Sequence, residues 1–155
     1  MGAQDNLTNV LAVVLGVTIG SGQAQLVALA GLAAGVAEAV SMGGVLYSAT
    51  RAEQGMARRE GRPPGDRLNP LQSGLTTFGA SLVAALIPLL PFAFLPLPQS
   101  LAVSLLLSVS ALFLLGSWTG RLNGEQWWRD GLRLVVVAGM AALAAALVGA
   151  ALRLE

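Results

Sequence analysis

The chain has 155 residues, of which 55% are hydrophobic and only 11% are charged. Soluble domains carry about a quarter charged residues, so this chain has too few charges to coat a soluble globule. Its net charge of +1 shows no excess of basic residues of the kind that nucleic-acid-binding domains carry. The absence of cysteine and histidine excludes thiolate or imidazole metal sites and the usual cysteine or histidine nucleophiles.

Five apolar segments are predicted to cross a membrane as helices, because about 20 residues are needed to span about 30 Å of hydrocarbon. Their apolar runs are continuous and do not alternate, which excludes barrel strands. The segments are residues 6–21, 26–47, 71–95, 101–118 and 132–152. No signal peptide is visible before the first segment, which we therefore expect to remain as a helix. The fold class is an all-α membrane protein with one transmembrane domain over residues 1–155.

The second and third segments carry local signals for packing and for helix ends. Residues Gly31, Gly35, Ala39 and Gly43 form a stripe of small residues four apart, which predicts a helix-contact surface. Asn69-Pro70 is a good N-cap followed by proline in the first turn of a helix. Pro88 and Pro91 are expected to kink or end that helix.

The distribution of arginine predicts the orientation in the membrane. Two connections are basic, the short segment 49–68 and the segment before residue 132, whereas residues 20–25 and 96–100 hold no basic residue. The basic residues are Arg51, Arg58, Arg59, Arg62 and Arg67 in the first connection, and Arg121, Arg129 and Arg133 in the second. The positive-inside rule places both connections and the N-terminus in the cytoplasm, and the C-terminus outside. Tyr47, Trp118, Trp127 and Trp128 would then lie at the cytoplasmic interface.

Glu38 is the one ionisable residue of the second segment and lies near its middle. A carboxylate at this depth is costly, so it is expected to face a partner, a water-filled path or a transported cation. The alternative is a protonated side chain that bonds to a neighbouring helix. Met42 lies one helical turn further on the same face. A thioether beside a carboxylate suits a first-row metal such as Fe²⁺, although methionine in an apolar helix is more often packing.

Asp5, before the first segment, has two interpretations of equal weight. Asp5 or Asn6 could cap the first helix, where the helix dipole favours an acidic residue. Asp5 could instead supply a second carboxylate at the cytoplasmic end of the same pathway. No constellation typical of an enzyme is visible, so we expect no enzymatic activity and no permanently bound cofactor.

Several motifs together resemble the vacuolar iron transporter family over nearly the whole chain. Asp5-Asn6-Leu7 looks like the Asp-Gly-Leu opening of that family's first helix. Residues Gly31-Leu32-Ala33, Ser41-Met42-Gly43 and Tyr47 resemble the second helix. Asn69-Pro70-Leu71 with residues 87–92 is similar to the third helix, and Gly131-Leu132-Arg133 to the last. The family's metal-path aspartate falls on Asp5 and its methionine on Met42.

The resemblance implies a homodimer that moves Fe²⁺, and often Mn²⁺, out of the cytoplasm in exchange for protons, along a path at the dimer interface. Two departures matter. The family's acidic residue in the second helix would align with Ala34, one turn before Glu38. The cytoplasmic metal-binding domain of better-known members is absent from segment 49–68, as in the short, nodulin-like members.

The sequence therefore predicts a homodimeric exporter of Fe²⁺ or Mn²⁺ in a membrane, with Asp5, Glu38 and Met42 as the metal-binding residues. The expected partners are a second copy, membrane lipid, divalent metal ions and protons, with no nucleic acid. The expected location is the bacterial inner membrane. The alternative function is a membrane-embedded interaction or anchoring module without transport of its own, in which the small-residue stripes serve assembly.

Overall fold

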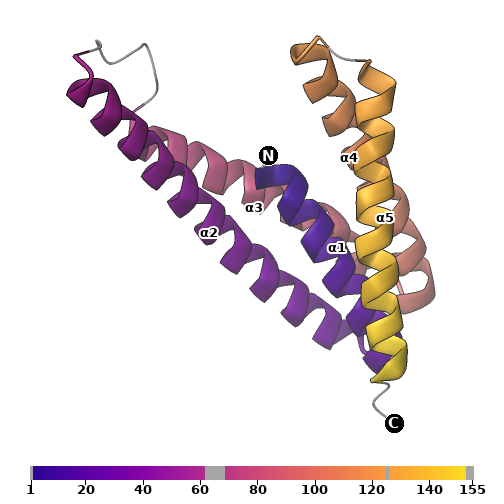
Figure 1. Ribbon diagram of the computed structural model, residues 1–155. Coiled ribbons are helices and arrows are strands. Elements are labelled where there is room, and N and C mark those ends of the chain that lie inside the picture. The colour runs from indigo at the N-terminus through magenta and orange to yellow at the C-terminus, as the bar shows by residue number, and fades with distance from the viewer. Residues whose placement is uncertain (1, 62–68, 125, 153–155) are drawn as a thin grey trace.

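The structure, a computed structural model, describes residues 2–61, 69–124 and 126–152, and these ranges contain helices and no strand. The helices are α1 (Gly2–Ser21), α2 (Ala24–Arg59), α3 (Pro70–Phe94), α4 (Leu97–Leu122) and α5 (Trp127–Ala151) (Figure 1). The predicted all-α fold is confirmed. Helices α2 to α5 are long and apolar enough to cross a membrane, and α1 is not among these four.

The helices contain the predicted segments except for one terminal residue of the third and of the fifth. The largest difference is in α2, which runs on to Arg59, so the first part of segment 49–68 is helix and not loop. Hydropathy marks where a helix leaves the hydrocarbon and not where it ends, and this stretch is rich in good helix formers such as alanine, glutamate and arginine. Arg62, Arg67 and Arg153 lie outside the described residues.

Helix α3 starts as predicted and passes through both of its prolines. The side chain of Asn69 accepts a hydrogen bond from the backbone N–H of Leu71 at 3.2 Å. The helix continues through Pro88 and Pro91 and ends at Phe94. The hydroxyl of Ser104 on α4 donates to the carbonyl oxygen of Pro88 at 2.7 Å, which ties the proline-containing turn to the next helix.

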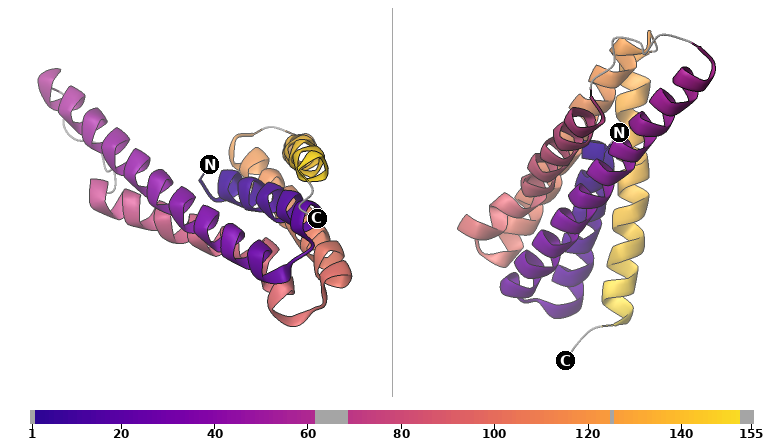
Figure 2. Two further views of the ribbon diagram at one scale, coloured as in Figure 1. Left: turned by 90° about the horizontal axis from the view of Figure 1, so that it is seen from below. Right: turned by 90° about the vertical axis from the view of Figure 1, so that its left-hand side faces the viewer.

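Helix α1 lies in the middle of the fold and contacts all four other helices. Two antiparallel pairs, α2 with α3 and α4 with α5, diverge on either side of it (Figures 1 and 2). Its buried side chains are at most 1% exposed, and they are Asn6, Leu7, Val10, Leu11 and Val14. Helix α1, which is not among the four helices that are apolar enough to cross a membrane, is thus covered by protein along the face that these residues form, and this contact reduces its need for an apolar surface.

The distribution of polar and apolar side chains is that of a protein surrounded by lipid. Large hydrophobic side chains are exposed along α2 to α5, for example Leu29, Leu106 and Leu143. Serine hydroxyls are turned inward instead, and Ser81 and Ser104 are completely buried. Apolar surface of this extent would be unfavourable in water, and inward hydroxyls are typical of helix contacts in membranes. The protein is therefore an integral membrane protein.

The small-residue stripe of α2 is a helix contact, as predicted. Gly31, Gly35, Ala39 and Gly43 are all buried. A Cβ atom on Gly35 would lie 2.7 Å from the Cβ of Ala85, and one on Gly43 would lie 3.0 Å from the carbonyl oxygen of Gly74. The missing side chains therefore let the backbones of α2 and α3 approach each other.

The C-terminal end of α2, the C-terminal end of α4 and the start of α5 lie at one end of the bundle, and the C-terminal end of α5 lies at the other (Figure 1). Two of the arginines pack over exposed tryptophans there. The guanidinium carbon of Arg121 is 5.5 Å from the ring centroid of Trp127, and that of Arg129 is 5.2 Å from the ring centroid of Trp128. This arrangement agrees with the predicted interface, while the sidedness stays a prediction.

The close approach of α2 and α3 predicts opposite outcomes for two glycines of α2. Gly35→Leu should lower the stability of the detergent-solubilised protein by about 1–3 kcal/mol or more, because its side chain would overlap Ala85. Gly44 has no atom within 4 Å of a Cβ position, so Gly44→Leu should change stability by about 0.5 kcal/mol or less. Thermal melts of both variants test this, and equal destabilisation would contradict the packing.

Candidate functional site

Glu38 lies half-buried in an open groove of about 600 Å³ between α1 and α2. The groove is lined by Asn9, Ala12, Val13, Ala34, Ala37, Glu38 and Ser41. Alanines surround the carboxylate, and its polar neighbours in the groove are the amide of Asn9 and the hydroxyl of Ser41. Glu38 therefore meets an open, weakly polar space and is not locked into the helix packing.

Met42, one turn from Glu38 along α2, packs against the first turn of α1. A Cβ atom on Gly2 would lie 3.3 Å from the Cε of Met42 and 3.4 Å from its Cβ. Because Gly2 has no side chain, the start of α1 can rest directly on the thioether. Glu38 and Met42 thus share one face of α2, as their spacing predicted, and this face lies toward α1.

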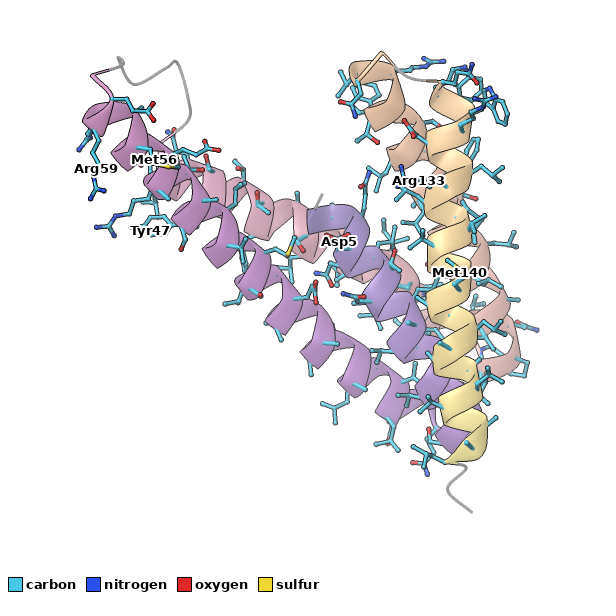
Figure 3. The ribbon with its side chains drawn as sticks, in the orientation of Figure 1. Asp5, Tyr47, Met56, Arg59, Arg133 and Met140 are labelled. Carbon is cyan, nitrogen blue, oxygen red and sulfur yellow. The ribbon has the colours of Figure 1, made fainter. Side chains whose placement is uncertain are left out.

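Asp5 lies in the first turn of α1 and is exposed. Helix α1 begins at Gly2, so the prediction that Asp5 or Asn6 caps it is wrong. Gly2, Asp5 and Asn9 follow each other at three- and four-residue spacing and share one face of α1. Asp5 therefore lies between Gly2, which contacts Met42, and Asn9, which lines the groove together with Glu38. Figure 3 shows it at the start of α1.

The structure thus places Glu38 and Met42 at the interface of α1 and α2, and Asp5 on the face of α1 that carries Asn9 of the groove. Within the described ranges, however, no three acidic, histidine or cysteine side chains cluster closely enough to hold a metal ion. One protomer offers carboxylates and a thioether that do not by themselves enclose an ion. Asn9 and Ser41 are additional oxygen donors that the sequence analysis did not single out. The position of Asn9, one turn after Asp5, could have indicated it.

Asn6 fixes the rotation of α1 and was not recognised from sequence. Its side chain is completely buried, and its amide nitrogen donates to the carbonyl oxygen of Gly35 on α2 at 3.0 Å. The same nitrogen donates to Ser81 on α3, at 3.0 Å to the carbonyl and 2.9 Å to the hydroxyl. The hydroxyl of Ser81 in turn donates to the carbonyl oxygen of Gly2 at 3.3 Å. These bonds tie α1 to both neighbours.

The orientation of the Asn6 amide follows from its surroundings. Two carbonyl oxygens and a hydroxyl lie next to its nitrogen. If the amide were flipped, its oxygen would face the two carbonyl oxygens, which cannot donate a hydrogen bond to it. Asn6 points into the bundle, whereas Asp5 and Asn9 leave α1 on the side of the groove. The buried amide therefore presents the polar face of α1 to α2.

A family model described as the VIT family matches residues 1–63 and 53–150 of the chain. The chain belongs to this family. Its members are the vacuolar iron transporters, so the resemblance seen in the sequence is confirmed. Membership indicates transport of metal ions across a membrane, and it supports the expectation that the protein is not an enzyme. No curated protein matches the chain. The two matched ranges overlap at residues 53–63, in the connection where the resemblance places the missing cytoplasmic domain.

Because Asn6 acts as a buried hydrogen-bond donor, we expect the stability of the protein to depend more on its N–H groups than on the volume of its side chain. Asn6→Asp removes both N–H donors and sets a carboxylate against two carbonyl oxygens. It should cost about 1–3 kcal/mol or more, and more than Asn6→Ala, which leaves buried acceptors unpaired without adding repulsion. Thermal melts in detergent measure the difference.

The matched control for this test is Asn9→Ala, on the exposed side of the same helix. It should change stability by no more than about 0.5 kcal/mol. An Asn6→Asp variant as stable as the wild type would contradict the assigned bonds.

Proposed function

We propose that the protein exports a divalent metal ion, Fe²⁺ or Mn²⁺, from the cytoplasm across the inner membrane in exchange for protons. The metal path follows the face shared by α1 and α2. The observation that carries this proposal is the half-buried Glu38, which lines an open groove in the middle of an apolar helix. Asp5 and Met42 lie on the same face, on the way to the cytoplasmic end predicted from the arginines.

The donor set favours a first-row divalent ion. Carboxylate, amide and hydroxyl oxygens are hard ligands that suit Mn²⁺ as well as Mg²⁺ and Ca²⁺. The thioether of Met42 is a soft ligand, which neither Mg²⁺ nor Ca²⁺ prefers, whereas Fe²⁺ accepts both kinds. In the absence of cysteine and histidine, binding is expected to be weak. Weak binding suits a transported ion, which must also leave.

We propose further that a second copy completes the path. The groove around Glu38 adjoins an apolar groove of about 600 Å³ lined by α1, α2 and α5, and both share Ala12 and Val13. A two-fold axis along this combined face would cover apolar surface and bring Asp5, Glu38 and Met42 next to their mates. The number of metal ligands would then double. The two copies together would have enough ligands to enclose an ion, which one protomer does not have.

Proton exchange follows from the chemistry of the carboxylates. A carboxylate binds the cation only when it is deprotonated, so metal entering from the cytoplasm displaces a proton from each protonated ligand. Protons arriving from the outer side bind the carboxylate oxygens as the metal–oxygen contacts break. The metal then leaves outward, and the protons are carried inward and released to the cytoplasm when the next metal ion binds, so that one proton on each of the two Glu38 carboxylates balances the charge of one divalent ion.

The direct test is metal uptake into proteoliposomes under a pH gradient. Glu38→Gln keeps the shape of the side chain and removes its charge. Flux of Fe²⁺ and Mn²⁺ should fall about tenfold or more, because loss of a charged contact costs at least about 1.5 kcal/mol. Asp130→Asn makes the same change on α5, away from the groove, and should keep full flux.

Full flux through Glu38→Gln would overturn the proposed site. A second comparison separates transport from the anchoring-module alternative. The melting temperature of the wild type should rise with added Mn²⁺, and that of Glu38→Ala should not. Equal insensitivity of both proteins would favour a module without transport.

A further inference from the structure

A basic hollow lies between the C-terminal part of α2 and the start of α3, away from the groove of Glu38. Its volume is about 470 Å³. The residues lining it are Tyr47, Arg51, Gln54, Gly55 and Arg58 from α2, and Asn69, Pro70 and Leu71 from the start of α3. Neither the proposed transport nor the family resemblance assigns a role to this hollow.

The two arginines of the hollow form no ion pair that the structure shows within the described part of the chain. Arg51 and Arg58 are two helical turns apart and lie on one face of α2. Both are exposed, and no carboxylate of residues 2–61, 69–124 or 126–152 forms an ion pair with either. The arginines at the other connection differ, because Arg121 and Arg129 lie over tryptophan rings. The hollow therefore presents two exposed guanidinium groups, and guanidinium is the side-chain group that best matches a phosphate.

An apolar groove of about 200 Å³ continues from this hollow along α2 and α3. It is lined by Val40, Gly43, Gly44, Tyr47, Leu71, Gly74, Leu75 and Phe78. Tyr47 and Leu71 line both spaces, so the two are adjacent. Tyr47 is labelled in Figure 3 and marks this junction. Gly44 leaves part of the groove open, since a Cβ atom on it would have no neighbour within 4 Å.

The order of the two spaces matches the order of chemical groups in a membrane leaflet. The apolar part of α2 ends near Tyr47, a residue type that prefers the boundary between headgroups and hydrocarbon. The apolar groove lies on the hydrocarbon side of Tyr47, and the arginines lie beyond it. A phospholipid presents a phosphate and then acyl chains in the same direction.

We propose that the protein binds an anionic phospholipid at this place. Its phosphate lies between Arg51 and Arg58, and one acyl chain lies in the groove between α2 and α3. Charge complementarity supplies the preference for an anionic headgroup. The acyl groove supplies the preference for a lipid over a soluble phosphate, because a small anion leaves the apolar part of the site uncovered.

The test uses the purified full-length protein in detergent, with native mass spectrometry and thermal melts as readouts. The probes are phosphatidylglycerol, phosphatidylcholine with the same acyl chains, and glycerol phosphate. The wild type should retain and be stabilised by phosphatidylglycerol in preference to the other two. Arg51→Gln/Arg58→Gln should lower its affinity for phosphatidylglycerol about 20-fold or more, at about fivefold for each lost charge.

The matched control Arg129→Gln/Arg133→Gln makes the same change in net charge at the start of α5 and should keep the affinity. Loss in both double variants would show a general charge effect and overturn the site. Stabilisation by glycerol phosphate equal to that by phosphatidylglycerol would overturn the lipid assignment.

A second variant tests the acyl groove without changing charge. Gly44→Leu fills open space in the groove, and it should weaken retention of phosphatidylglycerol about tenfold, since it displaces several buried methylene groups of the chain. Retention equal to that of the wild type would overturn the placement of the acyl chain. Because Arg51, Arg58 and Gly44 lie outside the Glu38 groove, this result is independent of the transport assay.

Discussion

The completely buried amide of Asn6 is the contact on which the geometry of the site depends. It donates to backbone and hydroxyl oxygens of α2 and α3, and leaving these buried groups unpaired would be costly. This amide sets the rotation of α1, and the rotation decides which residues face α2. With Asn6 turned inward, the face of α1 that carries Asp5 and Asn9 is presented to Glu38 and Met42.

The same arrangement explains why α1, which is not among the four helices apolar enough to cross a membrane, lies at the centre. Helices α2 to α5 surround α1 with apolar outer surfaces, so α1 can carry Asp5, Asn6 and Asn9. Small residues allow this crowding, because Gly35 leaves space for both Ala85 and Val10. One side of α1 stays uncovered, along the groove that contains Glu38. A polar helix with one open side, in a protein of a metal-transporting family, is suited to form half of a path.

Hydropathy, spacing and motif resemblance predicted much of the fold and part of the site. The helices, the stripe from Gly31 to Gly43, the Asn69 cap and the shared face of Glu38 and Met42 depend on local patterns of three to four residues, which sequence displays directly. The role of Asn6 depends on which helices lie opposite, and no local pattern specifies that, whereas the spacing of Asn9 from Asp5 could have indicated Asn9. The extension of α2 to Arg59 was missed because helix formation continues where hydropathy stops. The basic hollow beside α3 is lined by this extension, so it could not be predicted from the sequence either.

The central claim is that two copies together hold one ion between the α1–α2 faces, with Glu38 from each. The stoichiometry of bound Mn²⁺, measured by electron paramagnetic resonance on purified protein of known chain concentration, tests it most directly. The account predicts one bound ion for two chains, and no bound ion in Glu38→Gln at the same metal concentration. One ion per chain, or an unchanged stoichiometry in Glu38→Gln, would contradict it.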